Sequence, residues 1–384
     1  MRLLHTADWH LGRIFHGIHL TDDQAHLLEQ FIQMARDTKP DAILITGDIY
    51  DRAVPPPEAV RLLDETLTRL CLDVGSPIII IAGNHDSPER LGFGSRIMAE
   101  RKLFIAGYPV HDPMRVQLQD KWGPVDLFPI PYAEPALVRE RLKTNEAIDQ
   151  ASSLKAIMDR IRMARCAGTR TILLGHAFIQ GCQASDSERP LSVGGAEAVE
   201  TSLFDGFDLV ALGHLHRSQS VNGGRIQYAG SLMKYSFGEA DLGKSASLVE
   251  MDGASGIAIQ KLPLVPRRDL RIIEGTFAEL LCSDPDDPKR EDYLMARLLD
   301  RDPVFDVMGR LQAVYPNLLH IERAQIPGVE GRIDAHADFR KRTEVDLFSS
   351  FVQDITQKEW DEDQRLRFEA VVSELRREDR EAIA

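Results

Sequence analysis

The chain has 384 residues, and its shares of 43% hydrophobic and 28% charged side chains are ordinary for a globular protein and argue against disorder. No apolar run is long enough to span a bilayer, which argues against membrane insertion. The net charge of −14 argues against a protein that holds nucleic acid through an overall positive field.

Five short apolar runs in the first two thirds of the chain are each followed directly by a polar motif. The runs lie at residues 3–4, 42–45, 78–81, 171–174 and 209–212, and their leucine and β-branched content is typical of buried strands. The motifs are Asp8-Trp9-His10, Gly47-Asp48-Ile49-Tyr50-Asp51, Gly83-Asn84-His85-Asp86, Gly175-His176 and Gly213-His214-Leu215-His216. Because ligand sites in such sheets lie just beyond the carboxyl ends of the strands, we expect all five motifs on one rim.

Helical signals alternate with these strands, which predicts an α/β domain. A capping box at Thr21-Asp22-Asp23-Gln24 opens the first helix, a second helix begins near Pro57, and a third covers roughly residues 146–165. Further along, the pattern changes to short strands at residues 247–251 and 256–260. We expect these strands to complete the sheets of the same domain.

A stretch rich in proline and arginine at residues 263–268 marks a boundary, so we expect one domain at 1–266 and a small second domain at 267–342. The remaining tail, 343–384, repeats apolar residues at helical spacing twice and carries twelve acidic against six basic residues. Two amphipathic helices cannot bury both apolar faces alone. The tail therefore either binds a partner or packs back on its own domain as a helical hairpin.

The side chains of the five motifs favour a centre that hydrolyses phosphodiesters with two divalent ions. Such hydrolysis needs an activated water and a means of holding charge on the phosphate oxygens, and two ions about 3.5 to 4 Å apart do both. A carboxylate suits the bridging position, which we assign to Asp48. The other ligands of one ion are then Asp8, His10 and His216, and those of the second ion are Asn84, His176 and His214. An extended backbone would turn Asp8 and His10 the same way, and likewise His214 and His216.

Imidazole, carboxylate and amide oxygens without a thiolate favour manganese or iron over a structural zinc site, with magnesium as an alternative. Two such ions would make the rim locally positive, so the site attracts phosphate even though the chain is acidic. His85 follows a ligand and is free to contact phosphate or to protonate the leaving oxygen. We expect Asp86 to orient His85 through its second ring nitrogen.

Two groups of residues are expected to bind no ligand. The histidines outside the motifs are assigned ordinary structural or surface roles: His5, His16, His19, His26, His111, His320 and His336. The segment from Gly238 to Ser245 matches the phosphate-cradling pattern GxxxxGK[ST], but that pattern needs a following helix, and residues 246–251 predict a strand. We therefore expect this chain to bind no nucleotide.

The start of the chain resembles no signal peptide, and its four cysteines form no CxxC pair. Reduced thiols are typical of a cytoplasmic protein, which is the location we expect.

The sequence around the motifs resembles the SbcD family of DNA double-strand-break repair exonucleases, among the calcineurin-like metallophosphoesterases. The matching stretches are LHTADWHLG at 4–12, GDIYD at 47–51, GNHDS at 83–87, GHLH at 213–216 and YAGS at 228–231. The tail also resembles that family from Asp346-Leu347-Phe348 onward. One position departs, since many relatives have histidine where this chain has Asp51, and no role of that histidine is carried over.

The resemblance implies a two-sheet αββα sandwich, a small α+β capping domain that contacts DNA, and a C-terminal helical tail that binds the coiled-coil ATPase subunit SbcC. It also implies a manganese-dependent nuclease of DNA repair, recombination and replication, located at the nucleoid. The implied activities are 3′ to 5′ exonuclease on double-strand ends and endonuclease on hairpins and single strands, in an assembly with two copies of each subunit. By the same resemblance, the catalytic residue is His85 and the metal ligands are Asp8, His10, Asp48, Asn84, His176, His214 and His216.

Two other functions fit parts of the sequence. A phosphoesterase for a small molecule or a phosphoprotein would share every metal residue, but it has no need of a second domain and an amphipathic tail. A non-catalytic scaffold of the same fold has no reason to keep seven ligands and His85 together. The nuclease is therefore the function we expect.

Overall fold

The structure is a computed structural model, and it describes residues 1–188, 198–282, 288–300, 302, 304–324, 348–349, 365 and 367–368. The chain divides into two compact units, Met1–Ala324 and Gln325–Ala384. Most of the second unit, including most of the tail predicted at 343–384, lies outside the described residues. Within that unit the rings of Phe348 and Phe368 stack with their centroids 4.3 Å apart. In the described part of the chain, no helix is long and apolar enough to cross a membrane.

The first sheet contains the strands that precede three of the five motifs. Its strand order is β16 (Ile257–Pro263), β15 (Ser245–Met251), β1 (Arg2–Thr6), β4 (Ala42–Thr46), β5 (Ile78–Ile81) and β6 (Leu103–Ala106). The last four are parallel, and β15 and β16 extend the sheet from β1 as antiparallel strands. Every residue of β4 and β5 is buried, because the sheet is covered on both faces. This explains why these strands are unbroken apolar runs and do not alternate.

The second sheet contains the strands that precede the other two motifs. Its order is β13 (Gln219–Val221), β14 (Ile226–Tyr228), β12 (Leu209–Gly213), β9 (Arg170–His176), β8 (Gly123–Pro129) and β7 (Val116–Asp120). The four inner strands are parallel, and the two edge strands are antiparallel to their neighbours. The register pairs Gly213 with His176, so β9 and β12 end side by side.

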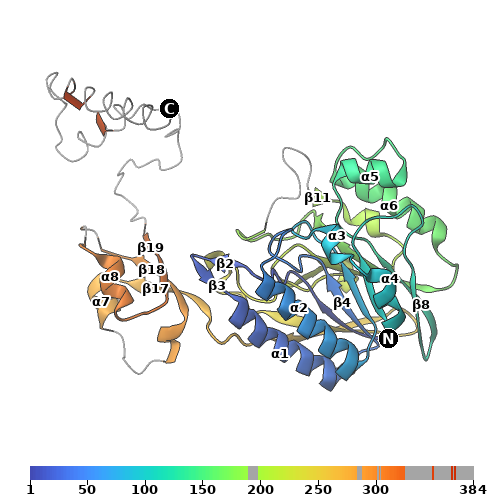
Figure 1. Cartoon of the computed structure of the whole chain (residues 1–384), viewed down its shortest axis with the longest axis horizontal. Coiled ribbons are helices and arrows are strands. Elements are labelled where there is room, and N and C mark those ends of the chain that lie inside the picture. Colours follow the sequence, from blue (N-terminus) through green and yellow to red (C-terminus); the bar gives the residue numbers. More distant parts are fainter. Residues whose placement is uncertain are drawn as a thin grey trace. The chain divides into compact units, whose positions relative to one another are not determined.

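Three apolar cores hold four layers together, as the αββα prediction requires. The core between the sheets joins residues such as Leu44 and Ile79 of the first sheet to Leu127 and Leu174 of the second. Helices α1 (Thr21–Thr38) and α2 (Pro57–Arg69) cover the outer face of the first sheet. Helices α5 (Pro135–Leu142) and α6 (Gln150–Ala164) cover the outer face of the second, and Figure 1 shows the two helix pairs in different parts of the fold.

Short elements follow the motifs. They are the hairpin β2 (Ile14–Phe15) and β3 (Ile18–His19), the helices α3 (Pro88–Leu91) and α4 (Ser95–Met98), and the paired strands β10 (Phe178–Ile179) and β11 (Ala198–Val199). The elements predicted at 247–251 and 256–260 are β15 and β16, and they complete the first sheet as expected.

The capping box predicted for α1 is wrong. The residue before the helix, Leu20, is its N-cap, and no side chain caps it. The side chain expected to complete the box, Gln24, is fully buried and donates from Nε2 to the carbonyl oxygens of Trp9 and His10 at 3.1 and 2.7 Å. Gln24 thus holds the loop of the first polar motif in place. The buried carbonyl oxygens of this loop require hydrogen-bond donors, and this requirement outweighs capping of the exposed helix end.

The third predicted helix is shorter than expected. It begins after Asp149, whose carboxylate accepts from the backbone N–H of Ser152 at 2.8 Å, so an N-cap sets the start of α6.

A separate three-stranded sheet follows near the end of the first unit. Its strands β17 (Leu270–Gly275), β18 (Tyr293–Leu298) and β19 (Leu318–Arg323) are parallel, and α7 (Phe277–Leu281) and α8 (Val307–Gln312) accompany them. It has its own apolar core, which includes Leu294 and Leu311. It is tied to the sandwich by the Tyr293 hydroxyl, which donates to Asp23 at 2.7 Å. The border expected at 266/267 stays a prediction.

Candidate metal centre

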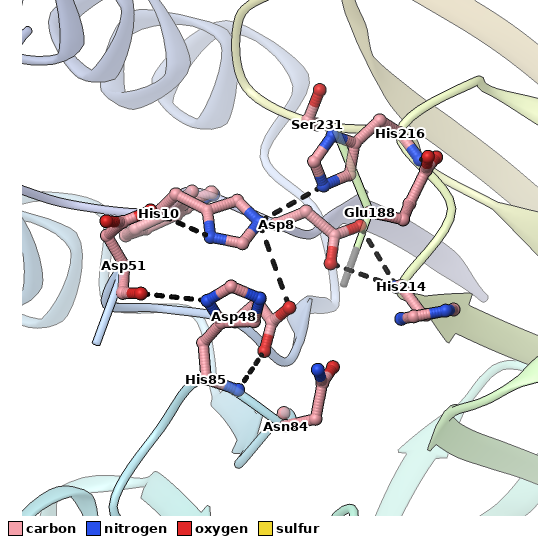
Figure 2. Close-up of polar contacts among 12 residues, drawn as sticks. Asp8, His10, Asp48, Asp51, Asn84, His85, Glu188, His214, His216 and Ser231 are labelled. Carbon is pink, nitrogen blue, oxygen red and sulfur yellow. Dashed lines mark hydrogen bonds and ion pairs between the residues drawn. The ribbon is translucent and has the colours of Figure 1, made fainter. Parts of the chain in front are cut away.

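The five motifs meet where the carboxyl ends of the two sheets come together. Three arrive after β1, β4 and β5 of the first sheet, and two after β9 and β12 of the second. Figure 2 shows side chains from four of these motifs gathered in one region, among them His10, Asp48 and Asn84. The rim expected from the sequence is therefore formed by both sheets.

Asp48 lies between the predicted ligands of both ions. Its Oδ2 is 3.4 Å from His176 Nε2 and 3.8 Å from His10 Nε2, while its Oδ1 accepts from the backbone N–H of His85 at 2.9 Å. A bridging carboxylate has to face two ligand groups in this way.

The remaining predicted ligands form two groups around Asp48. In one, the Nε2 atoms of His10 and His216 are 3.1 Å apart. In the other, His176 Nε2 is 2.9 Å from Asn84 Oδ1, and the rings of His176 and His214 are 5.3 Å apart. The division of these ligands between two ions stays a prediction.

Asp8 contacts residues that the sequence assigned to the other ion. Its carboxylate accepts from the backbone N–H of His214 at 2.9 and 3.1 Å, and it forms a compact group with Asp48 and His176. Its assignment to the ion of His10 and His216 stays a prediction.

The backbone at the ligands is not extended, contrary to the expectation. Asp8, His10, Asp48 and His214 have φ values of 52°, 46°, 49° and 97°, in or near the left-handed region. Such conformations are costly for residues other than glycine and persist where the surrounding fold holds them. Trp9, between two of these ligands, is completely buried.

Glycines in the motifs allow neighbouring parts of the centre to approach closely. A Cβ atom at Gly83 would lie 2.1 Å from Asp48 Oδ1. A Cβ atom at Gly213 would lie 1.9 Å from the carbonyl oxygen of Thr46, which belongs to the other sheet. Both contacts are far inside van der Waals distance, so glycine is required at both positions.

Burial sets the protonation of the histidines and aspartates. Desolvation holds the pKa of His10 and of His214 well below the usual value, so both rings are neutral and carry a free lone pair. Burial raises the pKa of Asp8, although the charge of His176 opposes it. For Asp48 burial acts in the same direction and is the largest single effect, but the charge and hydrogen bond of His176, together with the neighbouring histidines, hold the pKa well below its usual value.

His176 lies among acceptor atoms that suit a positive charge. Its Nδ1 donates to the carbonyl oxygen of Thr46 at 2.9 Å, so a neutral ring presents only a lone pair at Nε2. That lone pair faces Asn84 Oδ1 and Asp48 Oδ2, which are also acceptors. Burial alone would lower the pKa of His176, but the nearby carboxylates raise it to about 9. A positive charge among these atoms removes the conflict.

The donor set fits divalent ions. Neighbouring ligands of an octahedral ion with bonds of about 2.1 Å are about 3 Å apart. The separations of 3.1 Å between His10 and His216 and of 2.9 Å between His176 and Asn84 agree with that spacing.

His85 lies at this centre, but Asp86 does not orient it. The His85 Nδ1 donates to the backbone carbonyl of Asp51 at 2.8 Å, which leaves Nε2 free. The Asp86 carboxylate is buried and accepts instead from backbone N–H groups of Ile49, Tyr50 and Gly83. The prediction for Asp86 is corrected: it fixes the loop after β4 against the loop after β5.

Two further residues lie beside His10 that were not predicted as ligands. Asp51 forms a compact group with His10 and His85, and its Oδ1 is 3.7 Å from His10 Nδ1. A carboxylate at the end of the second motif was the signal for it. Tyr235 stacks edge-on against His10 with ring centroids 5.3 Å apart, and no local pattern indicated that contact.

The segment from Gly238 to Ser245 is packed beside His216. Glu239 is completely buried and pairs with Lys244. Burial alone would raise the pKa of Glu239, but the nearby His216 ring and the charge of Lys244 hold it well below its usual range. Ser245 begins strand β15, in agreement with the strand predicted there.

The histidines expected to bind no ligand have ordinary surroundings where the structure describes them. His5 is completely buried, and its Nε2 lies 2.9 Å from the Thr46 hydroxyl. The others that are described are exposed: His16, His19, His26, His111 and His320. His336 lies outside the described residues.

Two family models and a curated protein match the chain. Residues 1–218 match the family model described as calcineurin-like phosphoesterase. Residues 266–356 match the model described as type 5 capsule protein repressor C-terminal domain. The curated SbcD subunit of the nuclease SbcCD from Staphylococcus epidermidis is 33% identical over 361 residues, which cover 93% of this chain and 94% of that protein.

Two solved structures are also similar. A dimetal phosphatase from Danio rerio has a TM-score of 0.43 and 12% identity, over 69% of this chain and 96% of that chain. The TT1561 protein of Thermus thermophilus has a TM-score of 0.39 and 15% identity, over 68% of this chain and 98% of that chain.

The sandwich, with polar loops from both sheets meeting at one rim, defines a calcineurin-like phosphoesterase. Members of this class hold a centre of two divalent ions, and the donor set described above fits such a centre. The chain is therefore a metal-dependent phosphodiesterase. Within this class the chain belongs to the SbcD family of nuclease subunits, because the likeness extends over nearly its whole length.

Proposed function

We propose that the chain is the DNA nuclease subunit of an SbcCD-type repair complex, with 3′ to 5′ exonuclease activity on double-strand ends and endonuclease activity on hairpins and single strands. One observation carries the proposal: Asp48 faces both groups of predicted ligands, and His85 lies beside it, in a member of this nuclease family.

The ligands in this proposal are the seven residues named from the sequence. Asp48 would bridge the two ions, and the other six residues would complete their protein ligands: Asp8, His10, Asn84, His176, His214 and His216. Manganese is the proposed metal, since imidazole and oxygen donors without thiolate suit it, and magnesium or iron are alternatives. When bound, the ions activate the attacking water and neutralise charge on the phosphate oxygens.

His85 is the proposed general acid. Its Nδ1 donates to the carbonyl oxygen of Asp51, which fixes the orientation of the ring. The free Nε2 is then the atom that delivers a proton to the leaving oxygen of the cleaved phosphodiester. His10 supports the ring from the side, with centroids 4.7 Å apart.

The proposed partners are DNA and a coiled-coil ATPase of the SbcC type. The capping domain at 267–342 would contact DNA, and the acidic tail at 343–384 suits a protein partner better than DNA. We further propose two copies of each subunit, acting at the nucleoid. Binding of ATP belongs to the partner, since Lys244 of the phosphate-loop-like segment is bound internally.

The test is a cleavage assay with end-labelled duplex and hairpin DNA, with manganese or magnesium, and with or without the ATPase. We expect manganese-dependent shortening from 3′ ends and opening of hairpins. Faster hydrolysis of cyclic nucleotides than of duplex ends would instead favour a small-molecule phosphoesterase. No bound metal and no hydrolysis at all would favour a scaffold.

A further inference from the structure

The segment that matches a phosphate-binding loop contains a buried ion pair. Glu239 lies at the end of the turn η5 (Phe237–Glu239), is completely buried and pairs with Lys244, which is 9% exposed. A buried pair of this kind requires that the remaining donors and acceptors be satisfied. The hydrogen-bond partners of Glu239 and Lys244 therefore decide what this ion pair does.

All three N–H groups of Lys244 are used inside the protein. They donate to the Glu239 carboxylate, to the carbonyl oxygen of His216 at 2.8 Å and to the Ser231 hydroxyl at 2.8 Å. An ammonium group has three donors, so none is left for a phosphate. Lys244 instead connects Glu239 to the backbone of a predicted metal ligand.

The His216 ring is connected to the same carboxylate through Ser187. The Ser187 Oγ is 2.5 Å from His216 Nδ1 and also donates to Glu239 Oε1. An ionised carboxylate only accepts, so the hydroxyl proton of Ser187 points to Glu239. The Ser187 oxygen then accepts from His216 Nδ1–H. This order of donors leaves a lone pair on His216 Nε2, the atom that faces His10.

We infer that Ser187, Glu239 and Lys244 form a positioning relay that fixes the tautomer and the orientation of His216 for metal binding. The relay does for His216 what the Thr46 carbonyl does for His176, whose Nδ1 also donates away from the centre. Residues that hold a ligating histidine in this way typically change metal affinity 10- to 100-fold when removed. The inference rests on the proposed role of His216 as a ligand.

The backbone of His216 is held by the same neighbourhood. Its N–H donates to Glu188 Oε1 at 2.7 Å, next to Ser187, and its carbonyl oxygen accepts from Lys244. The ring and the backbone of His216 are therefore fixed by different residues. Removing the Ser187 hydroxyl should release the ring while the backbone of the loop stays bound.

The experiment is calorimetric titration of the chelator-treated full chain with Mn²⁺. Ser187→Ala removes the relay hydroxyl, and Ser187→Thr restores one. The matched control is Ser236→Ala, because Ser236 donates to the same Glu239 oxygen at 3.3 Å but does not contact the His216 ring. A double variant, Glu239→Met with Lys244→Met, removes both charges with similar volumes and avoids an unpaired buried charge.

We expect wild type to bind two Mn²⁺ ions. In Ser187→Ala and in the double variant, the Kd of one ion should rise about 10- to 100-fold, while the melting temperature of the metal-free protein stays near wild type. Ser187→Thr and Ser236→Ala should bind both ions like wild type. In protein labelled with ¹⁵N-histidine, the Nδ1–H signal of His216 should broaden or shift in Ser187→Ala.

Unchanged affinity for both ions in Ser187→Ala would overturn the relay and leave the proposed function standing. An equal loss in Ser187→Ala and Ser236→Ala would also overturn it, because both would then act through general packing. A wild-type chain that binds no Mn²⁺ would overturn the metal centre itself, and the relay with it.

Discussion

The Nε2 atoms of His10 and His216 face each other at 3.1 Å, although 206 positions separate the two residues in the chain. His10 follows a strand of the first sheet, and His216 follows a strand of the second. Only the packing of one sheet on the other brings them together, so the centre exists in the folded state alone. Binding of ions should therefore be coupled to the stability of the fold.

Manganese should stabilise the protein by mass action. At a free concentration 100 times the Kd, one site adds about 2.7 kcal/mol to the free energy of unfolding, because the unfolded chain lacks the site. Scanning calorimetry with and without Mn²⁺ should show a higher melting temperature with metal, reversed by a chelator. An unchanged melting temperature at saturating Mn²⁺ would contradict a site built between the sheets.

Asp48→Asn should abolish metal-dependent cleavage with little loss of fold. The substitution keeps the volume and an oxygen for the His85 N–H, but it removes the charge that faces both histidine groups. Cleavage of labelled hairpin DNA and circular dichroism of the same sample measure the two effects. Activity near wild type would refute the bridging assignment.

His85→Ala should retain both ions and slow turnover, on the order of 10²-fold or more for a lost proton donor. Its ring is fixed through Nδ1 by a backbone carbonyl and is not needed to assemble the ligands. Parallel measurement of Mn²⁺ stoichiometry and of kcat separates the two roles. If the variant bound only one ion, His85 would be a ligand.

Much of the centre could be predicted from the sequence because buried parallel strands are continuous apolar runs, and their ends have a fixed place in such folds. The run at 78–81 and the motif after it are an example, since β5 is wholly buried and Asn84 lies at the centre. The left-handed backbone at Asp8 could not be predicted, because it is imposed by loops from elsewhere in the chain. The position of Ser187 beside His216 likewise depends on tertiary packing and has no local signature.

Two errors have the same cause. The sequence predicted a partner close in the chain for each of two side chains. Gln24 was expected in a helix cap, and Asp86 was expected to support the neighbouring His85. Both side chains instead satisfy backbone groups of neighbouring loops. Buried loops carry many N–H and C=O groups that no secondary structure pairs. Leaving such a group without a partner costs more free energy than losing a local hydrogen bond that water can replace.

Gly213→Ala should destabilise the chain by about 1 to 3 kcal/mol or more, the range for overpacking in a tight core. The added methyl group would lie 1.9 Å from the carbonyl oxygen of Thr46, so one of the two sheets has to move. The matched control is Gly243→Ala, at an exposed glycine with nothing within 4 Å of its Cβ position. Urea unfolding of the two variants compares them directly. Equal stability would mean that the sheets approach less closely than described.

His5→Gln should make the metal-free protein more resistant to acid. Burial lowers the pKa of His5 from 6.5 to about 3, so below pH 6.5 the unfolded chain takes up a proton that the folded chain refuses. Stability is therefore lost as the pH falls from 6.5 toward 3, by up to about 5 kcal/mol. Gln keeps a polar atom near the Thr46 hydroxyl and does not titrate. Urea midpoints at pH 7 and pH 4.5 should differ less in the variant, and identical pH dependence would contradict the burial of a neutral His5.

The most direct measurement is anomalous scattering from crystals of the full chain soaked in Mn²⁺. Two peaks about 3.5 to 4 Å apart are expected, with Asp48 between them and His10 and His216 together on one peak. Peaks elsewhere, or a cleft that stays empty at saturating metal, would contradict a centre shared by the two sheets.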